Sequence, residues 1–522
     1  MLAQSACLKC SERKKKCDKA YPVCGQCERL LFRCYYRATA LPAGKTNIIQ
    51  AESISYVYQP SNEETLANDL IHLQSILGPA YISRLNTIVL NHRQIIIHLA
   101  TAFLASCPRW MPIIQQYTFQ QICEYDIPQT SQGPVLLLLT MCMLTRPLMS
   151  KGHNNQPDAL RESMYTTVKR LFWEPGTIHE AATTIIKAGL FLSIYEYGHG
   201  MLNPSYMTMN VCSSMAQIRQ LGGVHDSLGL PPFGAESSKQ HDILKLWWGL
   251  KIHERMISLE NGYAIKPINI DEAELMNNDR LELELESAKS YLSIDSHYFA
   301  YHLQARAAIW LELVLRVVRD PNAITAAGRL RFQAVDRGLL RYLTIILGLG
   351  MGTCCEAIAI GLNAFVHLHR GRLKLSNSFH FSEQDKLESS RALETMLRIL
   401  SDFFDDQLFK NPGFIIASPT DDNGIFRETF PYFVHMTYVI LLELKEHGRF
   451  EQLPTSSEAP PLEKEVEALW SILNFAAEHW QIARTVASNW LFQVGSRIPT
   501  LLRPDYTAAH RKGGSTSDSA YM

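Results

Sequence analysis

Residues 5–34 read SACLKCSERKKKCDKAYPVCGQCERLLFRC, and this short stretch holds half of the twelve cysteines of the 522-residue chain. The spacing is C-x2-C-x6-C, then six residues, then C-x2-C-x6-C again, so one half-motif occurs twice. The cysteines are Cys7, Cys10, Cys17, Cys24, Cys27 and Cys34. Thiols at such regular spacing indicate either a metal site or a set of disulfides.

Six thiols fit two metal ions better than one. A tetrahedral zinc ion takes four ligands, so a single zinc would leave two thiols unused. Two zinc ions have eight ligand positions, and six thiolates fill them if two sulfurs bridge both metals. A segment of this length cannot bury enough apolar surface to fold alone, so metal binding would supply its folding free energy. The sequence therefore predicts two zinc ions held by the six cysteines.

Three disulfides, as in small secreted domains, are the alternative. No secretion signal is expected, because the residues MLAQSA are too few and lack a charged start. Cys142 lies in an apolar run, and Cys354 and Cys355 are adjacent. These positions are typical of buried free thiols in a reducing compartment, so we expect metal ligands rather than disulfides.

A basic run, SERKKK, occupies residues 11–16 between the second and third cysteines. Residues 1–37 carry nine Lys and Arg against three Asp and Glu, whereas the rest of the chain carries 41 against 48. The net charge of −1 therefore hides a cationic N-terminal segment on an acidic body. This asymmetry indicates a polyanionic partner such as nucleic acid. The alternative interpretations of the basic run are a solvent-exposed surface without a partner, or a nuclear import signal.

The cysteine spacing, the basic run and Pro22 in the connecting loop resemble the DNA-binding domain of fungal zinc binuclear cluster transcription factors. The resemblance implies that Cys7 and Cys24, the first thiol of each half, bridge two zinc ions. It also implies that a helix starting after Cys10 enters the major groove of double-stranded DNA at a CGG-type triplet.

The DNA contacts implied by this resemblance come from the basic run. In the family, the third and fourth residues after the second cysteine meet the bases, and here these are Arg13 and Lys14. Their donors match the O6 and N7 acceptors of guanine. Four lysines are assigned to phosphates, which give affinity but little specificity: Lys9, Lys15, Lys16 and Lys19. Ser11 departs from the family, because many members carry a basic residue there.

The resemblance implies a nuclear RNA polymerase II transcription factor that binds CGG-like half-sites and contacts the transcription machinery or co-regulators. An activator of a pathway or gene cluster is favoured, with secondary metabolism as the narrower hypothesis. The alternative is a zinc-stabilised protein-interaction regulator, or a repressor, without direct DNA readout. No HExxH, GxSxG or P-loop pattern occurs, so an enzyme is not expected.

We expect four segments: a zinc cluster domain at 5–37, a linker at 38–60, an all-α regulatory region at 61–500 and a disordered tail at 501–522. The linker contains no heptad repeat that would form a dimeric coiled coil. The protein therefore binds one triplet as a monomer, or forms a homodimer through the helical body.

Apolar residues recur at three- and four-residue spacing through the body, which predicts helices. The predicted helices are Leu66–Leu77, Ile88–Leu104, Val135–Leu144, Ala182–Tyr197, Leu303–Val318, Leu330–Leu347, Leu387–Phe409, Tyr432–Leu444 and Val466–Phe492. Strand-like alternation is scarce, so the fold class is mostly α. With 47% hydrophobic residues, the body can bury a large core.

Two stretches of the body, Ala182–His225 and Leu246–Ile270, resemble the middle homology region that follows such clusters. Where that family shows an Asp-Arg pair, this chain has Glu254 and Arg255. We expect these two side chains to form structural ion pairs rather than to act in catalysis. Core positions are expected at Trp247, Trp248 and Ile252.

Three further patterns could be mistaken for functional sites. Tyr342–Val366 is long enough for a membrane span, but its glycines and Glu356 favour a buried helix-break-helix, and no membrane partner is expected. Tyr165-x3-Lys169 mimics the proton-transfer pair of some reductases, yet no nucleotide-binding unit precedes it, so we interpret it as one helix turn. The acidic and aromatic residues 401–409 are interpreted as the packed end of a helix rather than an activation segment.

The number of thiols predicts a metal stoichiometry that native mass spectrometry of the full-length protein can measure. We expect two zinc ions, and we expect a strong chelator to unfold the N-terminal segment because metal binding supplies its folding free energy. Limited proteolysis before and after chelation reports that unfolding. A different zinc count, or an N-terminal segment that resists protease after chelation, would contradict the prediction.

Overall fold

The computed structural model describes most of the chain between residues 60 and 396, together with shorter pieces outside that range. The described residues are 10, 15–19, 26, 60–106, 111–114, 119–120, 122–123, 132–146, 157–180, 182–221, 239–261, 282, 296–349, 351–375, 383–393, 395–396, 432, 434–437, 439, 473, 477, 480–481 and 483–485. The chain divides into two compact units, Met1–Gln59 and Pro60–Met522, and each is considered by itself.

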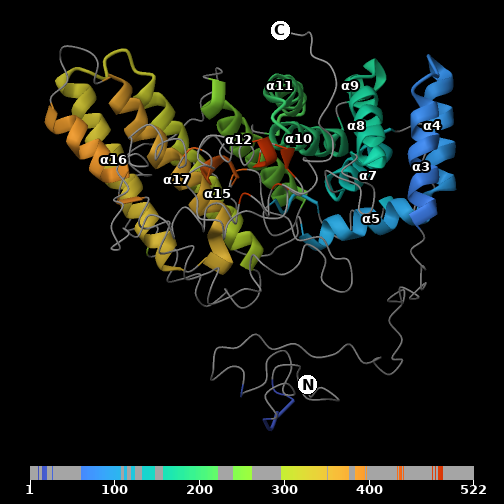
Figure 1. Ribbon diagram of the computed structural model, residues 1–522, viewed down its shortest axis with the longest axis horizontal. Coiled ribbons are helices and arrows are strands. Elements are labelled where there is room, and N and C mark those ends of the chain that lie inside the picture. The colour runs from blue at the N-terminus through green and yellow to red at the C-terminus, as the bar shows by residue number, and fades with distance from the viewer. Residues whose placement is uncertain are drawn as a thin grey trace, which may run out of the picture. The chain divides into compact units, whose positions relative to one another are not determined.

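The second unit is built of α-helices. Its described helices are α3 (Pro60–Leu73), α4 (Pro79–Asn91), α5 (Arg93–Ser106), α7 (Gly133–Leu144), α8 (Ala159–Phe172), α9 (Pro175–Glu180), α10 (Thr183–Gly198), α11 (Leu202–Ile218), α12 (Lys239–Asn261), α15 (Ser296–Val318), α16 (Ala326–Gly348) and α17 (Met351–Leu375). In Figure 1, α3 and α4 lie at one end of this unit and α16 at the other, with α10, α11 and α12 between them. No β-strand occurs in the described part of the chain, and the all-α fold class is confirmed.

Two helices, α7 and α10, form the centre of the first half of this unit because they are apolar on nearly every side. The sequence of α7 is GPVLLLLTMCML, and every residue except Pro134 is buried. In α10 every residue from Ile185 to Gly198 is buried. A helix that is apolar all round has to be covered on all sides. Accordingly, α10 packs against α7, α8, α11 and α12.

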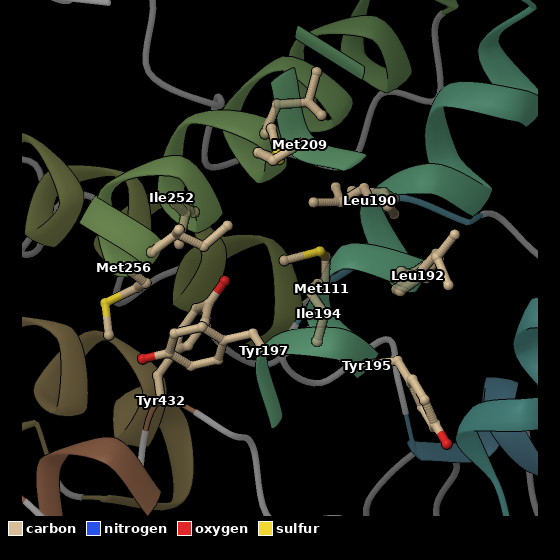
Figure 2. Close-up of a cluster of buried hydrophobic side chains, with 14 of the residues drawn as sticks. Met111, Leu190, Leu192, Ile194, Tyr195, Tyr197, Met209, Ile252, Met256 and Tyr432 are labelled. Atoms are coloured by element: carbon tan, nitrogen blue, oxygen red, sulfur yellow. The ribbon is translucent and has the colours of Figure 1, made fainter. Parts of the chain in front are cut away.

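The core beside α10 is completed by a residue from far along the chain. Figure 2 shows Tyr197 of α10 directed toward Tyr432 and toward Met256 of α12, while Tyr195 points the other way. The rings of Tyr197 and Tyr432 are both fully buried, and their centroids lie 5.9 Å apart at an interplanar angle of 80°. This edge-to-face arrangement is the favoured geometry for two aromatic rings.

In the second half of the unit, α15 takes the central place. Every residue from Phe299 to Leu315 is buried, and α15 packs against α12, α16 and α17. The approach of α16 is close because Gly338 faces Trp310, whose ring would lie 2.4 Å from any Cβ placed on that glycine. A larger residue at this position would therefore force the two helices apart.

One predicted helix, Ile88–Leu104, is in fact two helices. α4 ends at Asn91 and α5 begins at Arg93, and His92 between them has φ −104°. The Nε2 atom of His92 lies 2.8 Å from Oδ2 of Asp69 on α3. This polar contact from another helix accompanies the break, and apolar spacing in one sequence does not reveal it.

Two helices that the apolar spacing does not predict have polar residues on their buried faces. Apolar spacing does not predict α8 or α11, because their buried faces include Thr167 and Thr208.

The predicted helix-break-helix at Tyr342–Val366 is confirmed, since α16 ends at Gly348 and α17 begins at Met351. A search of the described helices found none with the length and apolar character needed to span a membrane.

Several predicted segments lie wholly or largely outside the described residues. These are the predicted linker, residues 401–409, the tail, and much of the helices Leu387–Phe409, Tyr432–Leu444 and Val466–Phe492. Within the last of these, Trp480 is not helical, so the stretch is not one continuous helix.

At the N-terminal side of the unit, Arg146 joins α3 to α8. Its Nη1 lies 2.6 Å from Oε1 of Glu63, and its Nη2 lies 2.6 Å from Oδ2 of Asp158. Asp158 also accepts the backbone N–H of Arg161 at 2.8 Å and so caps α8. Burial alone would lower the pKa of the Arg146 guanidinium, but the carboxylates of Asp158 and Glu63 raise it above its ordinary value.

Glu254 and Arg255 belong to a buried network between α12 and α15. The fully buried Arg255 places Nη2 2.5 Å from Oε2 of Glu312 and Nη1 2.7 Å from Oε2 of Glu254. Nη2 of Arg316 lies 2.5 Å from the other oxygen of Glu312, and Nζ of Lys251 lies 3.0 Å from Glu254. Burial, and then the Arg255 cation, lowers the pKa of Lys251. The expectation of structural ion pairs is confirmed.

Removing the central cation of this network should strongly destabilise the body. We expect Arg255→Met to cost about 3–5 kcal/mol in the free energy of unfolding, because two carboxylates lose a buried partner. The double variant Arg255→Met with Glu312→Leu should recover part of that loss, since one of those carboxylates is then absent. Denaturant unfolding of the full-length protein, followed by circular dichroism, gives both values.

Arg316→Met is the matched control, because Arg316 contacts the same Glu312 but its side chain is 30% exposed. A loss for Arg255→Met no larger than the loss for Arg316→Met would show that the buried network does not hold α12 to α15.

Candidate DNA-binding segment and buried polar clusters

Cys10 and the residues after it are the main described part of the first unit. Cys10 is helical and only 3% exposed, and its carbonyl accepts the backbone N–H of Lys15 at 2.9 Å. From Lys15 to Lys19 the backbone is not helical. The residues between Cys10 and Lys15, where a helix is expected, lie outside the described part of the chain. Arg13 and Lys14 lie outside the described residues.

The structure describes three of the six predicted DNA contacts, and all three are exposed: Lys15, Lys16 and Lys19. Lys19 has φ 61°, in the left-handed region that residues other than glycine seldom adopt. This conformation changes the direction of the chain two residues after Cys17. Lys9, like Arg13 and Lys14, is not among the described residues.

The described thiols fit a metal-binding segment. Cys10 is buried although it lies in a small unit, and Cys17 is partly buried. Thiolate sulfur is a ligand that zinc prefers, and the CxxC spacing is typical of zinc sites. The other four cysteines of the motif, Cys7, Cys24, Cys27 and Cys34, lie outside the described residues.

In the body, Tyr165 and Lys169 of α8 both reach the fully buried Glu196 of α10. Nζ of Lys169 lies 2.5 Å from Oε1 of Glu196, and the Tyr165 hydroxyl donates to the same oxygen at 3.2 Å. Thr208 of α11 donates to the other oxygen at 2.8 Å. Burial raises the pKa of Glu196, and the Lys169 ammonium opposes that rise.

The Tyr165-x3-Lys169 pattern is thus more than one helix turn, because it supplies two of the partners of a buried carboxylate. Glu196 is not among the residues predicted from the sequence. The available signal was a lone acidic residue inside the apolar run FLSIYEYG, at a place where a helix has no polar face.

A second buried cluster joins α10, α11 and α12. Nε2 of His253 lies 2.9 Å from the hydroxyl of Ser193, and Nδ1 lies 2.7 Å from the hydroxyl of Tyr432. The hydroxyls of Ser193 and Ser205 are 2.9 Å apart. Burial lowers the pKa of His253 to about 3, so the imidazole is neutral near pH 7.

The Ser193–His253 contact resembles a nucleophile and its base, but the surroundings do not support catalysis. Both side chains are fully buried, and the second ring nitrogen of His253 contacts a tyrosine rather than a carboxylate. A nucleophile needs access to its substrate. We therefore interpret the cluster as a structural connection between three helices and the segment that carries Tyr432.

The environments of two histidines of α17 also indicate a structural role rather than a catalytic one. Nε2 of His369 lies 3.1 Å from Oδ1 of Asp336 on α16. Burial, and then nearby cationic groups, lowers the pKa of His367 to about 4. Among the described residues, no group of three or more His, Cys, Asp or Glu side chains is placed to hold a metal ion.

Comparison with known protein families gave two matches. Residues 5–41 match the fungal Zn(2)-Cys(6) binuclear cluster domain, and residues 100–306 match the fungal specific transcription factor domain. The first of these domains binds two zinc ions, and both occur in transcription factors, which are not enzymes. Neither the curated proteins nor the solved structures gave a match.

The second match runs from the end of α5 through α12 into α15, so it includes Glu196 with its partners, His253, Glu254 and Arg255. Tyr432 and Glu312, which contact His253 and Arg255, lie beyond its end. In this order, the two matched stretches of the chain are similar to the two-zinc domain and to the helical domain of fungal transcription factors.

Proposed function

We propose that this transcription factor reads CGG-type triplets through Arg13 and Lys14, held in place by two zinc ions that the six cysteines bind. The first thiol of each half, Cys7 and Cys24, would bridge the metals. Lys9, Lys15, Lys16 and Lys19 would contact phosphates. The observation that carries the proposal is the basic run enclosed between the second and third cysteines of the match to the two-zinc domain.

The charge distribution supports direct binding to DNA. The N-terminal 37 residues carry six more basic than acidic side chains, whereas the rest of the chain has a net charge of −7. An acidic body is repelled by phosphates, so attraction to DNA is confined largely to the N-terminal segment. The exposure of Lys15, Lys16 and Lys19 leaves these side chains accessible to phosphates.

The proposed role is that of a nuclear RNA polymerase II activator of a pathway or gene cluster, with 61–500 as its regulatory region and 38–60 as a linker. Co-regulators or the transcription machinery would contact the body, and two copies would pair through it. The alternative function is a zinc-stabilised protein-interaction regulator or a repressor. It would be favoured if the purified protein showed no salt-sensitive binding to duplexes that contain CGG.

Lys14→Ala should reduce discrimination between CGG and altered triplets by about 1–3 kcal/mol, because one set of donors to guanine is lost. Lys16→Ala is the matched control and should weaken binding to all duplexes equally. Gel-shift titration of full-length protein on CGG, CGA and CAG duplexes measures both effects. Equal weakening on every duplex by Lys14→Ala would assign Lys14 to a phosphate instead.

Lys19 offers a separate test because its backbone is left-handed. Lys19→Asn should keep the fold, since asparagine tolerates this conformation, and should lower the slope of log affinity against log salt by about one. Titrations at several salt concentrations measure the slope, and native mass spectrometry checks the zinc content. An unchanged slope with both zincs retained would remove Lys19 from the set of phosphate contacts.

Selection of bound sequences from a random DNA pool by the full-length protein would test the triplet and the dimer together. Paired triplets at fixed spacing would support a dimer formed through the body, and single triplets would support a monomer.

A further inference from the structure

Helix α16 has one buried face and one exposed face, each continuous along its length. The buried face contains Gly328, Phe332, Val335, Leu339, Tyr342, Leu343 and Ile346. The exposed residues on the opposite side are Arg329, Leu330, Gln333, Arg337, Leu340, Arg341 and Thr344, and we call them the α16 outer face. At 100° per residue this set forms a single band.

The α16 outer face mixes leucines with arginines. Leu330 is 67% exposed and Leu340 is 45% exposed. Leu330, Gln333, Arg337, Leu340 and Thr344 follow one another at alternating spacings of three and four residues. This is the spacing at which one helix presents a continuous line of side chains to a second helix.

The charge of α16 is opposite to that of the body. The helix carries four arginines and one acidic residue, although the chain outside residues 1–37 has a net charge of −7. Nη2 of Arg341 lies 3.2 Å from Oε1 of Glu282, but both side chains are about half exposed, so the pair is weak and exchangeable. Nε of Arg337 donates to the backbone carbonyl of Gln333 at 3.2 Å, and that bond leaves the outer nitrogens of its guanidinium for other acceptors.

A small apolar pocket adjoins this face at the N-terminal end of α16. It is lined by Val317 and Val318 of α15, Phe332 of α16, and Leu368 and Leu375 of α17. Arg329, which belongs to the α16 outer face, also lines the pocket. The pocket has a volume of about 20 Å³, so it can take only the tip of an apolar side chain, beside an acidic neighbour that meets Arg329.

We propose that the α16 outer face, with this pocket, binds an acidic amphipathic helix of a co-regulator protein. A second copy of the same face is excluded by charge, because Arg329, Arg337 and Arg341 would then oppose cations. Nucleic acid fits less well, since two exposed leucines would lie against a phosphate backbone. Leucine anchors flanked by carboxylates complement both features of the face.

Full-length, zinc-loaded protein can be tested with a fluorescein-labelled peptide of about three heptads, with Leu at a and d and Glu at e and g. Arg337→Glu should weaken binding of this peptide about tenfold in fluorescence anisotropy, because attraction becomes repulsion. The same variant should gain affinity for the peptide with Lys in place of Glu. A double variant, Leu330→Ser with Leu340→Ser, should also weaken binding of the Glu peptide.

Arg84→Glu is the matched control, because Arg84 is an exposed arginine on α4 at the other end of the unit. It should leave peptide binding unchanged, and thermal melts establish that each variant is folded. The N-terminal segment is also cationic and can bind the acidic peptide. The test therefore compares the peptide affinities of the two variants rather than relying on the affinity of the wild-type protein.

The proposal is wrong if Arg337→Glu and Arg84→Glu bind the peptide equally. It is also wrong if a duplex without CGG displaces the peptide and Arg337→Glu lowers affinity for that duplex, because the face then binds nucleic acid. The inference rests on the proposed regulatory role and names the chemistry of its partner. The test needs no CGG site, so the peptide proposal can fail while the DNA-binding proposal holds. Equally, the DNA-binding proposal can fail while the peptide proposal holds.

Discussion

Charged side chains on the central helices must find their partners inside the core, because these helices have no solvent-exposed face. Arg255 and Glu312 are both fully buried, on helices α12 and α15 that are themselves covered by neighbours. Taking two charges out of water costs several kcal/mol for each ion, and a short contact with good geometry offsets that cost without a large surplus. We therefore regard the Arg255–Glu312 pair as a constraint on which helices meet and in which register, more than as a source of net stability.

The same constraint operates at Glu196, where three side chains from two helices, α8 and α11, contact one buried carboxylate. A shift of α8 by one turn would remove Lys169 and Tyr165 from Glu196 together, leaving a buried carboxylate with Thr208 alone. The first unit has the opposite problem, because it has too few apolar residues for a core. Under the proposed function, thiolate bonds to zinc would supply its order by fixing the chain at a few points, and Lys15 and Lys16 between two of the cysteines are exposed.

How much of this arrangement the sequence predicts depends on whether the signal is local. The cysteine spacing and the apolar runs of α7 and α10 are local patterns, and the two-zinc domain and the all-α fold follow from them. The break at His92 is accompanied by a contact with Asp69 of another helix, which spacing along the chain does not reveal. The partners of Glu196 and His253 come from helices that only the tertiary structure brings together, so spacing along the chain cannot identify them.

Charge segregation connects the body to the function of the N-terminal segment. An acidic body limits non-specific contacts with phosphates, which favours binding through the segment proposed to read bases. A cationic exposed face on α16 works against that separation if it stays uncovered, because DNA attracts any accessible arginine cluster. An acidic helix bound to this face would neutralise it and restore the separation. Occupation of α16 would then lower the non-specific affinity of the whole protein while leaving the zinc-bound segment unchanged, so a co-regulator could sharpen DNA selectivity without touching DNA.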